Sequence, residues 1–270
     1  RGFTSTQLSQ ITSTQIAAFT SLNIVGLTSA QVGLIATSAI PGIETRDLVA
    51  LGTQQLVGLT TSQIGQVTSA QVNALTSLQV SGLTTAQVAV FSSSQVEALT
   101  SINLVGLSSA QLAAITTSAL SGFESRDIAA LVSTQVPGFT SSQLVLITSD
   151  QIAALSTASF GALSTAQIAA IGTSAIAGIE TRDLAALKSA QIAAFTTSQV
   201  AQLNSAQIGG LAAAQVSALT TSQVATINST QLASLNTANI AGLSSAQIGA
   251  LSTSALAGFE AVDISALTSA

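Results

Sequence analysis

Four short clusters of charged residues are the places in the sequence where ionisable side chains gather. In each cluster a Glu stands three residues before an Asp, and in three of them an Arg directly precedes the Asp. The members are Glu44, Arg46 and Asp47; Glu124, Arg126 and Asp127; Glu180, Arg182 and Asp183; and Glu260 and Asp263, with Ala261 and Val262 between them. Paired carboxylates can act as a general acid and base, or can supply oxygen ligands to Ca²⁺.

Two carboxylates beside a cation are too few for a tight calcium site, which takes six to eight oxygen ligands. We therefore expect a structural role, with the acidic side chains at a helix N-terminus and an ion pair across or between subunits. The alternative is weak calcium binding by the eight carboxylates, Glu44, Asp47, Glu124, Asp127, Glu180, Asp183, Glu260 and Asp263. The remaining charged residues Glu97, Asp150 and Lys188 are expected to be solvated surface charges.

The composition argues against catalysis. The chain has no His or Cys, and Lys188 is its one lysine, so the abundant Ser and Thr lack a base that could activate a nucleophile. We expect no enzymatic activity, no catalytic residue and no cofactor. Five basic residues and a net charge of −5 argue against binding to nucleic acid. No apolar run approaches the roughly 18 residues needed for a membrane span.

These clusters are part of an eight-residue repeat that runs without insertion from Phe3 to Ala266. The unit Leu163–Ala170 is representative, with a large apolar residue at position 1 and another at position 6. Eight residues at about 100° each do not return an α-helix to the same face, so no continuous apolar stripe forms. A continuous strand would point positions 1 and 6 to opposite faces. The chain must therefore turn within every octad.

The polar positions of the octad predict a very short helix. Ser or Thr at position 2 and Gln at position 5 form the S/T-x-x-Q capping box, and positions 1 and 6 form the hydrophobic staple. Twelve of the 19 glycines, counting Gly2 directly before the first octad, fall at position 8, where we expect a left-handed residue to end the helix. One octad buries too little apolar surface to be stable alone, so neighbouring units must stack. We predict an all-α solenoid of short capped helices; the alternative is a parallel β-solenoid with ladders of Ser, Thr and Gln.

A second level of order sets the charged clusters at regular places. Position 5 departs from Gln only within four blocks of four octads, residues 19–50, 99–130, 155–186 and 235–266, where it reads Asn or Ser, then Gln, Ala and Asp. The blocks are ten, seven and ten octads apart. With about 3.4 octads per turn, ten octads are close to three turns and seven are close to two. We therefore predict that the clusters share one face.

The blocks recur with a period of seventeen octads, so the chain reads as super-repeats 3–138 and 139–270 within one continuous solenoid, 1–270. The end of the sequence would continue into its beginning with little interruption of this pattern. Two readings follow: copies join head to tail, which is a contact that generates open filaments, or the chain is part of a longer array.

Octads such as Leu163–Ala170 and Leu243–Ala250 resemble the Leu-Thr-x-x-Gln-Ile octapeptides of long, low-complexity proteobacterial surface or secreted proteins, often described as adhesin-like. The resemblance implies an extracellular or cell-surface location and no enzymatic activity. It supplies no binding residues for this chain.

We expect the protein to be structural, forming extracellular filaments, a sheath or a matrix by head-to-tail and lateral self-association. Its main partner would then be itself, with cell-surface or matrix components as further partners. An adhesin stalk or interaction scaffold is the second hypothesis. Ice binding by rows of hydroxyl groups is the third, and it requires those hydroxyls to be exposed rather than used as caps.

Overall fold

A computed structural model describes residues 2–267 of the chain, and the last three residues of the second super-repeat lie outside them. The chain divides into two compact units, residues 1–139 and 140–270, and each is described by itself. The boundary lies one residue from the junction of the two super-repeats. Whether the whole chain is one continuous solenoid stays a prediction.

The first unit consists of short helices, one for each octad. They are α1 (Ser5–Ser9), α2 (Ser13–Ala17), α3 (Ser21–Ile24), α4 (Ser29–Val32), η1 (Thr37–Gly42), α5 (Thr45–Ala50), α6 (Thr53–Val57), α7 (Thr61–Ile64), α8 (Ser69–Ala74), α9 (Ser77–Gly82), α10 (Thr85–Val88), α11 (Ser93–Glu97), α12 (Ser101–Leu104), α13 (Ser109–Ala114), η2 (Leu120–Gly122), α14 (Ser125–Ala130) and η3 (Val136–Gly138).

The second unit has the same construction. Its helices are α15 (Ser141–Leu144), α16 (Ser149–Ala154), α17 (Thr157–Gly161), α18 (Thr165–Ala170), η4 (Thr173–Gly178), α19 (Thr181–Ala186), α20 (Ser189–Ala193), α21 (Thr197–Gln202), α22 (Ser205–Gly209), α23 (Ala213–Ala218), α24 (Thr221–Val224), α25 (Ser229–Leu232), α26 (Thr237–Ile240), α27 (Ser245–Ala250), η5 (Ala255–Gly258) and α28 (Ala261–Ala266).

The fold is an all-α solenoid, as the octad predicts, and residues 2–267 contain no β-strand. The β-solenoid alternative is wrong because the polar residues cap helices instead of forming ladders. In α10, for example, the Thr84 hydroxyl accepts from the Gln87 backbone N–H at 3.1 Å, and Gln87 Oε1 accepts from the Thr84 N–H at 2.9 Å. Leu83 and Val88, the staple pair at positions 1 and 6, are both buried.

The predicted left-handed glycines are wrong: no described residue, glycine or other, has a positive φ. Several glycines at position 8 serve a different purpose, which is close approach between turns. A Cβ added to Gly58 would lie 2.2 Å from the carbonyl oxygen of Ser29, and one added to Gly106 would lie 2.1 Å from that of Ser77. Each of these glycines therefore packs directly on backbone of the preceding turn, where no side chain fits.

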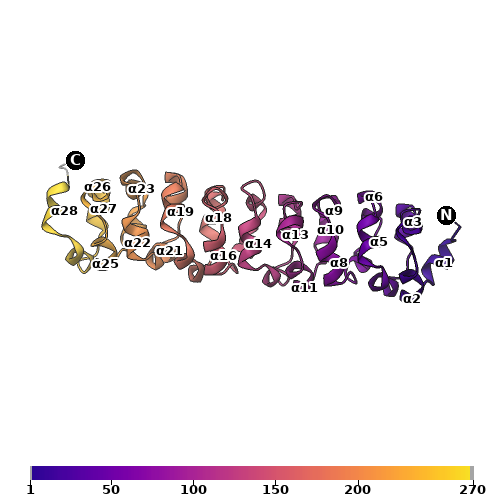
Figure 1. Cartoon of the computed structure of the whole chain (residues 1–270). Helices are drawn as coiled ribbons and strands as arrows, with labels where there is room; N and C mark the ends of the chain where they lie inside the picture. The colour runs from indigo at the N-terminus through magenta and orange to yellow at the C-terminus, as the bar shows by residue number, and fades with distance from the viewer. Residues whose placement is uncertain (1, 268–270) are drawn as a thin grey trace. The chain divides into compact units, whose positions relative to one another are not determined.

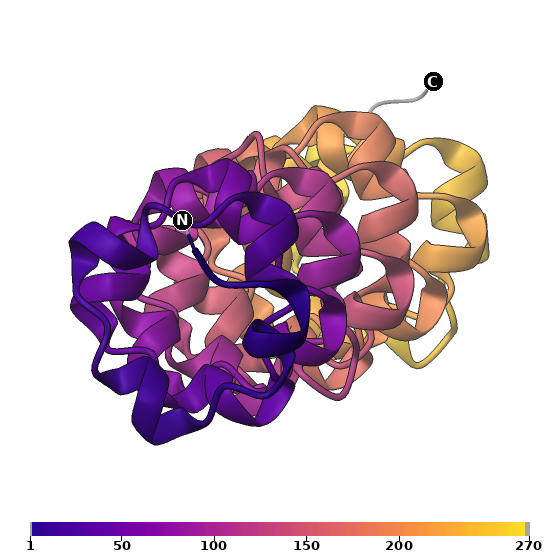
Figure 2. The same ribbon diagram turned by 90° about the vertical axis from the view of Figure 1, so that its right-hand side faces the viewer.

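Successive turns are also joined by the glutamine side chains. Gln87 donates from Nε2 to the carbonyl oxygens of Leu56 and Leu59, at 2.9 and 2.8 Å, which lie 31 and 28 residues earlier. Side-chain bonds in the other direction span 25 residues, as from Asn73 to the Ala98 carbonyl. These separations bracket 3.4 octads, about 27 residues (3.4 × 8). Within each unit the turns stack side by side (Figure 1), and each turn is a ring of short helices, seen best in the indigo N-terminal turns of Figure 2.

The third octad of every block forms a 3₁₀ segment instead of an α-helical turn. These segments are η1, η2, η4 and η5, and position 5 of their octads is Ala39, Ala119, Ala175 or Ala255. Without the glutamine there is no capping box to hold an α-helical start. The four alanines are buried, like the position 5 side chains of most other octads. The fifth 3₁₀ segment, η3, contains Pro137, which cannot donate a backbone hydrogen bond.

Candidate functional site

The four charged clusters begin four equivalent helices, α5, α14, α19 and α28. In each, the Glu occupies the N-cap position in place of the usual hydroxyl, and the Asp occupies the third helical position in place of Gln. The acidic residues are therefore at helix N-termini, where the orphan N–H groups favour negative charge.

Within each cluster the Asp is buried while the Arg is exposed. The side chains of Asp47, Asp127 and Asp183 are at most 1% exposed, whereas those of the adjacent arginines are 65–66% exposed. Each Arg pairs with the Glu of its own octad, at 2.6 Å for Arg46 and Glu44. Its Nε lies 3.6–3.8 Å from the buried Asp. The ion pairs are thus formed inside the octad, and the guanidinium keeps much of its surface free for another contact.

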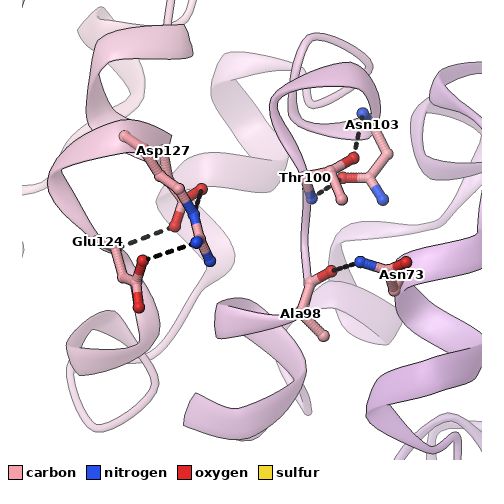
Figure 3. Close-up of polar contacts among 7 residues, drawn as sticks. Asn73, Ala98, Thr100, Asn103, Glu124 and Asp127 are labelled. Carbon is pink, nitrogen blue, oxygen red and sulfur yellow. Dashed lines mark hydrogen bonds and ion pairs between the residues drawn. The ribbon is translucent and has the colours of Figure 1, made fainter.

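The buried carboxylates make two kinds of hydrogen bond, which alternate along the chain. Asp47 and Asp183 accept from the hydroxyl groups of Ser21 and Thr157 in the preceding turn, both at 2.6 Å. Asp127 accepts instead from the backbone N–H of its own N-cap, Glu124, at 2.9 Å (Figure 3), and Asp263 does the same with Glu260. The difference follows the super-repeat, since equivalent clusters are seventeen octads apart.

Each of the three Arg-bearing clusters leaves one oxygen of its Asp buried without a hydrogen bond: Asp47 Oδ2, Asp127 Oδ1 and Asp183 Oδ2. In an ordinary octad position 5 is Gln, and its amide nitrogen donates to the preceding turn, as Gln87 does to Leu56 and Leu59. Asn103, at position 5 of its octad, donates in the same way to the carbonyls of Val72 and Leu75, at 3.4 and 3.5 Å. A carboxylate cannot donate. Burial raises the pKa of the Asp127 carboxyl above its ordinary value, although the Glu124 N–H and the Arg126 charge oppose the shift.

The two clusters of each unit lie on one face of that unit. In the first unit, α5 packs on α8, Asn73 of α8 donates to the Ala98 carbonyl at 3.3 Å, and Asn73 and Arg126 border the same surface depression. In the second unit, α19 packs on α22, Asn239 donates to the Gly209 carbonyl at 3.0 Å, and α26 packs on α28. The prediction from the octad spacing that the clusters share one face therefore holds within each unit.

An open depression lies beside the second cluster of each unit. In the first unit it has a volume of about 390 Å³ and is bordered by Asn73, Glu97, Leu99, Thr100, Ser101 and Arg126. In the second unit a depression of about 320 Å³ is bordered by Ala233, Ser234, Leu235, Asn236, Thr237, Glu260, Val262 and Asp263, largely the positions one super-repeat later. Among residues 2–267, no group of three or more Asp, Glu, His or Cys side chains converges as a metal site would require.

The structure also shows functional candidates that the sequence reasoning missed. The first is the second role of Gln, whose amide nitrogen bonds to the preceding turn. The second is a set of large aliphatic side chains on the surface: Leu22, Leu78 and Ile102 are 86%, 69% and 75% exposed. All three occupy position 4, where the other octads carry small or polar residues except for the last, which has Val262. That departure from the repeat is the signal that could have found them. Glu97, Asp150 and Lys188 are exposed, as expected.

Comparison with known proteins gives one family. The ALTTAQ repeat matches residues 40–77, 120–157, 176–213 and 224–261, which together are just over half of the chain. The first three stretches contain the three clusters that carry an Arg. The chain matches no curated protein. In the part of the chain that the structure describes, every helix is too short to span a bilayer.

Proposed function

Since the chain belongs to the ALTTAQ repeat family, we propose that it is a structural protein that builds filaments, a sheath or a matrix outside the cell by association with copies of itself. It acts mechanically, without catalysis or a cofactor. The extracellular setting is carried over from the resemblance of its octads to those of surface and secreted repeat proteins. The family match supports the repeat architecture on which this proposal is built.

The observation that carries the proposal is the ladder of amide bonds between turns. Gln79, for example, uses Oε1 to accept from the N–H of Thr76 at 3.0 Å and Nε2 to donate to the carbonyls of Leu48, Val49 and Leu51 at 2.9–3.1 Å. Within each unit, successive turns thus present amide donors on the side facing the preceding turn and carbonyl acceptors on the opposite side. The two sides are complementary to each other.

A surface of this kind favours association head to tail. Any turn that stands at the end of a stack offers donors or acceptors that a turn of another copy can match in the same register. Such a contact is heterologous, and it produces open filaments when its rotation does not close. The close glycine approach at position 8 adds shape complementarity at the same contact.

Two other functions are separable from this one. A stalk or scaffold that presents the face with the charged clusters to another molecule would use the same fold without self-association. Ice binding would need free, regularly spaced hydroxyl groups. At most octads the position 2 hydroxyl is used as a cap, as by Thr60 and Thr84 at 3.2 and 3.1 Å, so no observation favours that function.

Negative-stain microscopy over a range of protein concentrations tests the proposal. We expect filaments that lengthen with concentration. Gln7 and Gln15 lie in the first turn described, and each accepts from its cap N–H at 2.8–2.9 Å. The double variant Gln7→Glu and Gln15→Glu places carboxylates where a stacked copy would offer carbonyls, so it should shorten or abolish the filaments. Gln10→Glu, an exposed change outside position 5, is the matched control.

Monodisperse particles at every concentration would refute self-assembly and favour the stalk. Filaments of unchanged length in the Gln7→Glu and Gln15→Glu variant would show that the amide ladder does not continue between copies. Thermal hysteresis of the purified protein would point to ice binding instead.

A further inference from the structure

The first unit carries a row of exposed aliphatic side chains on the helices that bear its charged clusters or lie beside them. Three of these side chains are at position 4 of their octads and three at position 7. They are Leu22, Val25, Val49, Leu78, Ile102 and Val105, with exposed fractions from 38% to 86%. Exposed aliphatic groups that gather on one face commonly mark a contact with another molecule.

These residues share one face because of the helical repeat. α3 packs on α5, α9 packs on α12, and α12 packs on α14, which begins with the second cluster. α9 is seven octads after α3 and α12 is ten octads after it. With about 3.4 octads per turn these separations are close to two and three whole turns. The aliphatic side chains therefore lie along the unit next to Arg46 and Arg126.

The second unit has the opposite character at the equivalent positions, one super-repeat later. Every one of the six aliphatic residues is replaced by alanine or glycine. The replacements are Ala158, Gly161, Ala185, Ala214, Ala238 and Ala241. The contacts between helices are preserved, since α17 packs on α19 and α23 on α26. The second unit thus presents low points at the same spacing at which the first unit presents projecting side chains.

Gly161 shows that the small residues are not required by packing inside the unit. A Cβ added there would meet no atom within 4 Å, in contrast to the glycines at position 8 that press on backbone. Its counterpart Val25 is accommodated in the first unit and is 41% exposed. The fold therefore tolerates a large residue at this position, and the small one leaves space on the surface.

The charges of the two faces differ at the second cluster of each unit, whereas the first clusters are alike, with Arg46 and Arg182 at equivalent positions. Arg126 is 65% exposed in the first unit. Its counterpart in the second unit is Val262, so the exposed carboxylate of Glu260 has no arginine within its own octad. A first-unit face laid on a second-unit face in matching register would bring Arg126 opposite Val262, whose octad also carries Glu260. Ile102 would at the same time lie opposite Ala238.

We propose that the aliphatic face of the first unit docks on the alanine and glycine face of the second unit of another copy. This contact rests on the proposed function and specifies its lateral association. It is heterologous, since each copy keeps one projecting face and one flat face for further copies. A partner with the same spacing of positions is needed to fit all the projecting side chains together, and a second copy of this chain has that spacing.

Cross-linking tests the pairing directly, because the chain contains no native cysteine. A tagged Ile102→Cys protein is mixed with an untagged Ala238→Cys protein and treated with a short bismaleimide. Ala246→Cys, in α27, is the control partner: it is exposed and occupies position 4 of the next octad, on another face. We expect about tenfold more mixed dimer with Ala238→Cys than with Ala246→Cys, since docking raises the effective concentration of the paired thiols.

Equal yields with the two partners would overturn the proposal. A product dominated by Ile102→Cys homodimers would also overturn it, because it would mean that identical faces meet. Filling the low point gives a second test: Gly161→Val should weaken lateral association about tenfold, whereas Gly249→Val should leave it unchanged. Both glycines have open space around them, and Gly249 lies in α27, away from the proposed face.

The same samples separate this inference from the proposed function. If filaments form but have the same width in wild type and Gly161→Val, end-to-end assembly stands and the lateral contact is wrong. If Ile102→Cys and Ala238→Cys cross-link selectively but no filaments are seen, the lateral contact stands and the filament is wrong. Folding of each variant is checked by its circular dichroism spectrum.

Discussion

Replacing one buried glutamine of the amide ladder by glutamate isolates the hydrogen bonds that join the turns. Gln87 is 2% exposed, and its Nε2 donates to the carbonyls of Leu56 and Leu59 at 2.9 and 2.8 Å. Gln87→Glu keeps the shape and the Oε1 acceptor, but it sets a carboxylate oxygen against two carbonyl oxygens. Two buried hydrogen bonds of about 1 kcal/mol each are lost and a charge is left without a donor, so we expect a loss of about 4 kcal/mol at neutral pH.

The pH dependence of this loss has a definite sign. Burial next to carbonyl groups raises the pKa of the introduced carboxyl in the folded state above its unfolded value. The protonated acid can donate one of the two missing bonds. Stability therefore rises as the pH falls through the folded pKa, and this partial gain reaches its full size below the unfolded pKa. We expect about half of the loss to be regained near pH 4.

Urea unfolding followed by far-UV circular dichroism measures the effect. With a denaturant slope of about 2 kcal/mol per molar urea for a unit of this size, the midpoint should fall by about 2 M. Gln54→Glu is the matched control, because Gln54, at position 4 of its octad in α6, is exposed and makes no bond of the amide ladder. Equal midpoints for the two variants, or a loss at position 87 that does not shrink in acid, would refute the role assigned to the amide bonds.

Three further changes test the other contacts by the same unfolding measurement. Gly106→Ala should destabilise the first unit by about 3 kcal/mol, because the new Cβ would lie 2.1 Å from the Ser77 carbonyl oxygen. Gly249→Ala should be neutral or stabilising, because its new Cβ would have no atom within 4 Å. Equal effects of the two changes would contradict the close approach of Gly106 to the preceding turn. Asp127→Asn should stabilise by about 1 kcal/mol at neutral pH, since it supplies a donor to the preceding turn. Burial raises the pKa of Asp127, so protonation stabilises the folded wild type at low pH, and this stability is lost as the pH rises through that pKa. The advantage of the Asn variant should therefore disappear toward pH 4. An advantage independent of pH would contradict this assignment. Ala212→Ser should add about 1 kcal/mol, because Ala212 is an N-cap with no side-chain oxygen, and no gain would mean that this helix start is limited by other contacts.

The local structure of the octad was predictable because it depends on residues a few positions apart. The Thr84 hydroxyl and the Gln87 amide meet within one turn of helix, so their spacing alone predicts the cap. The number of octads per turn could also be approximated, since the blocks recur at intervals that must each hold a whole number of turns. The charged clusters were found for the same reason, as the departures of position 5 from Gln are visible in the sequence.

The roles of several residues were decided by the neighbouring turn, which no local pattern describes. Gly58 looked like a left-handed helix end, yet its φ is negative and it is pressed against the Ser29 carbonyl. Asp47 was expected at a helix N-terminus with an ion pair across or between subunits. It does begin a helix, yet it is buried, its Arg lies in its own octad, and it accepts a hydrogen bond from Ser21 of the preceding turn.

By itself, then, the sequence determined that this chain caps a short helix every eight residues and that the units must stack, because capping and staple contacts act over three to five residues. Only the tertiary structure decided which groups meet across turns: glutamine amides with carbonyls, glycines with backbone, and aspartates with buried surroundings. Those contacts join residues 25–31 apart, and their partners depend on the pitch and diameter of the stack. Pitch and diameter follow from how closely the turns pack, which is a property of all the turns together.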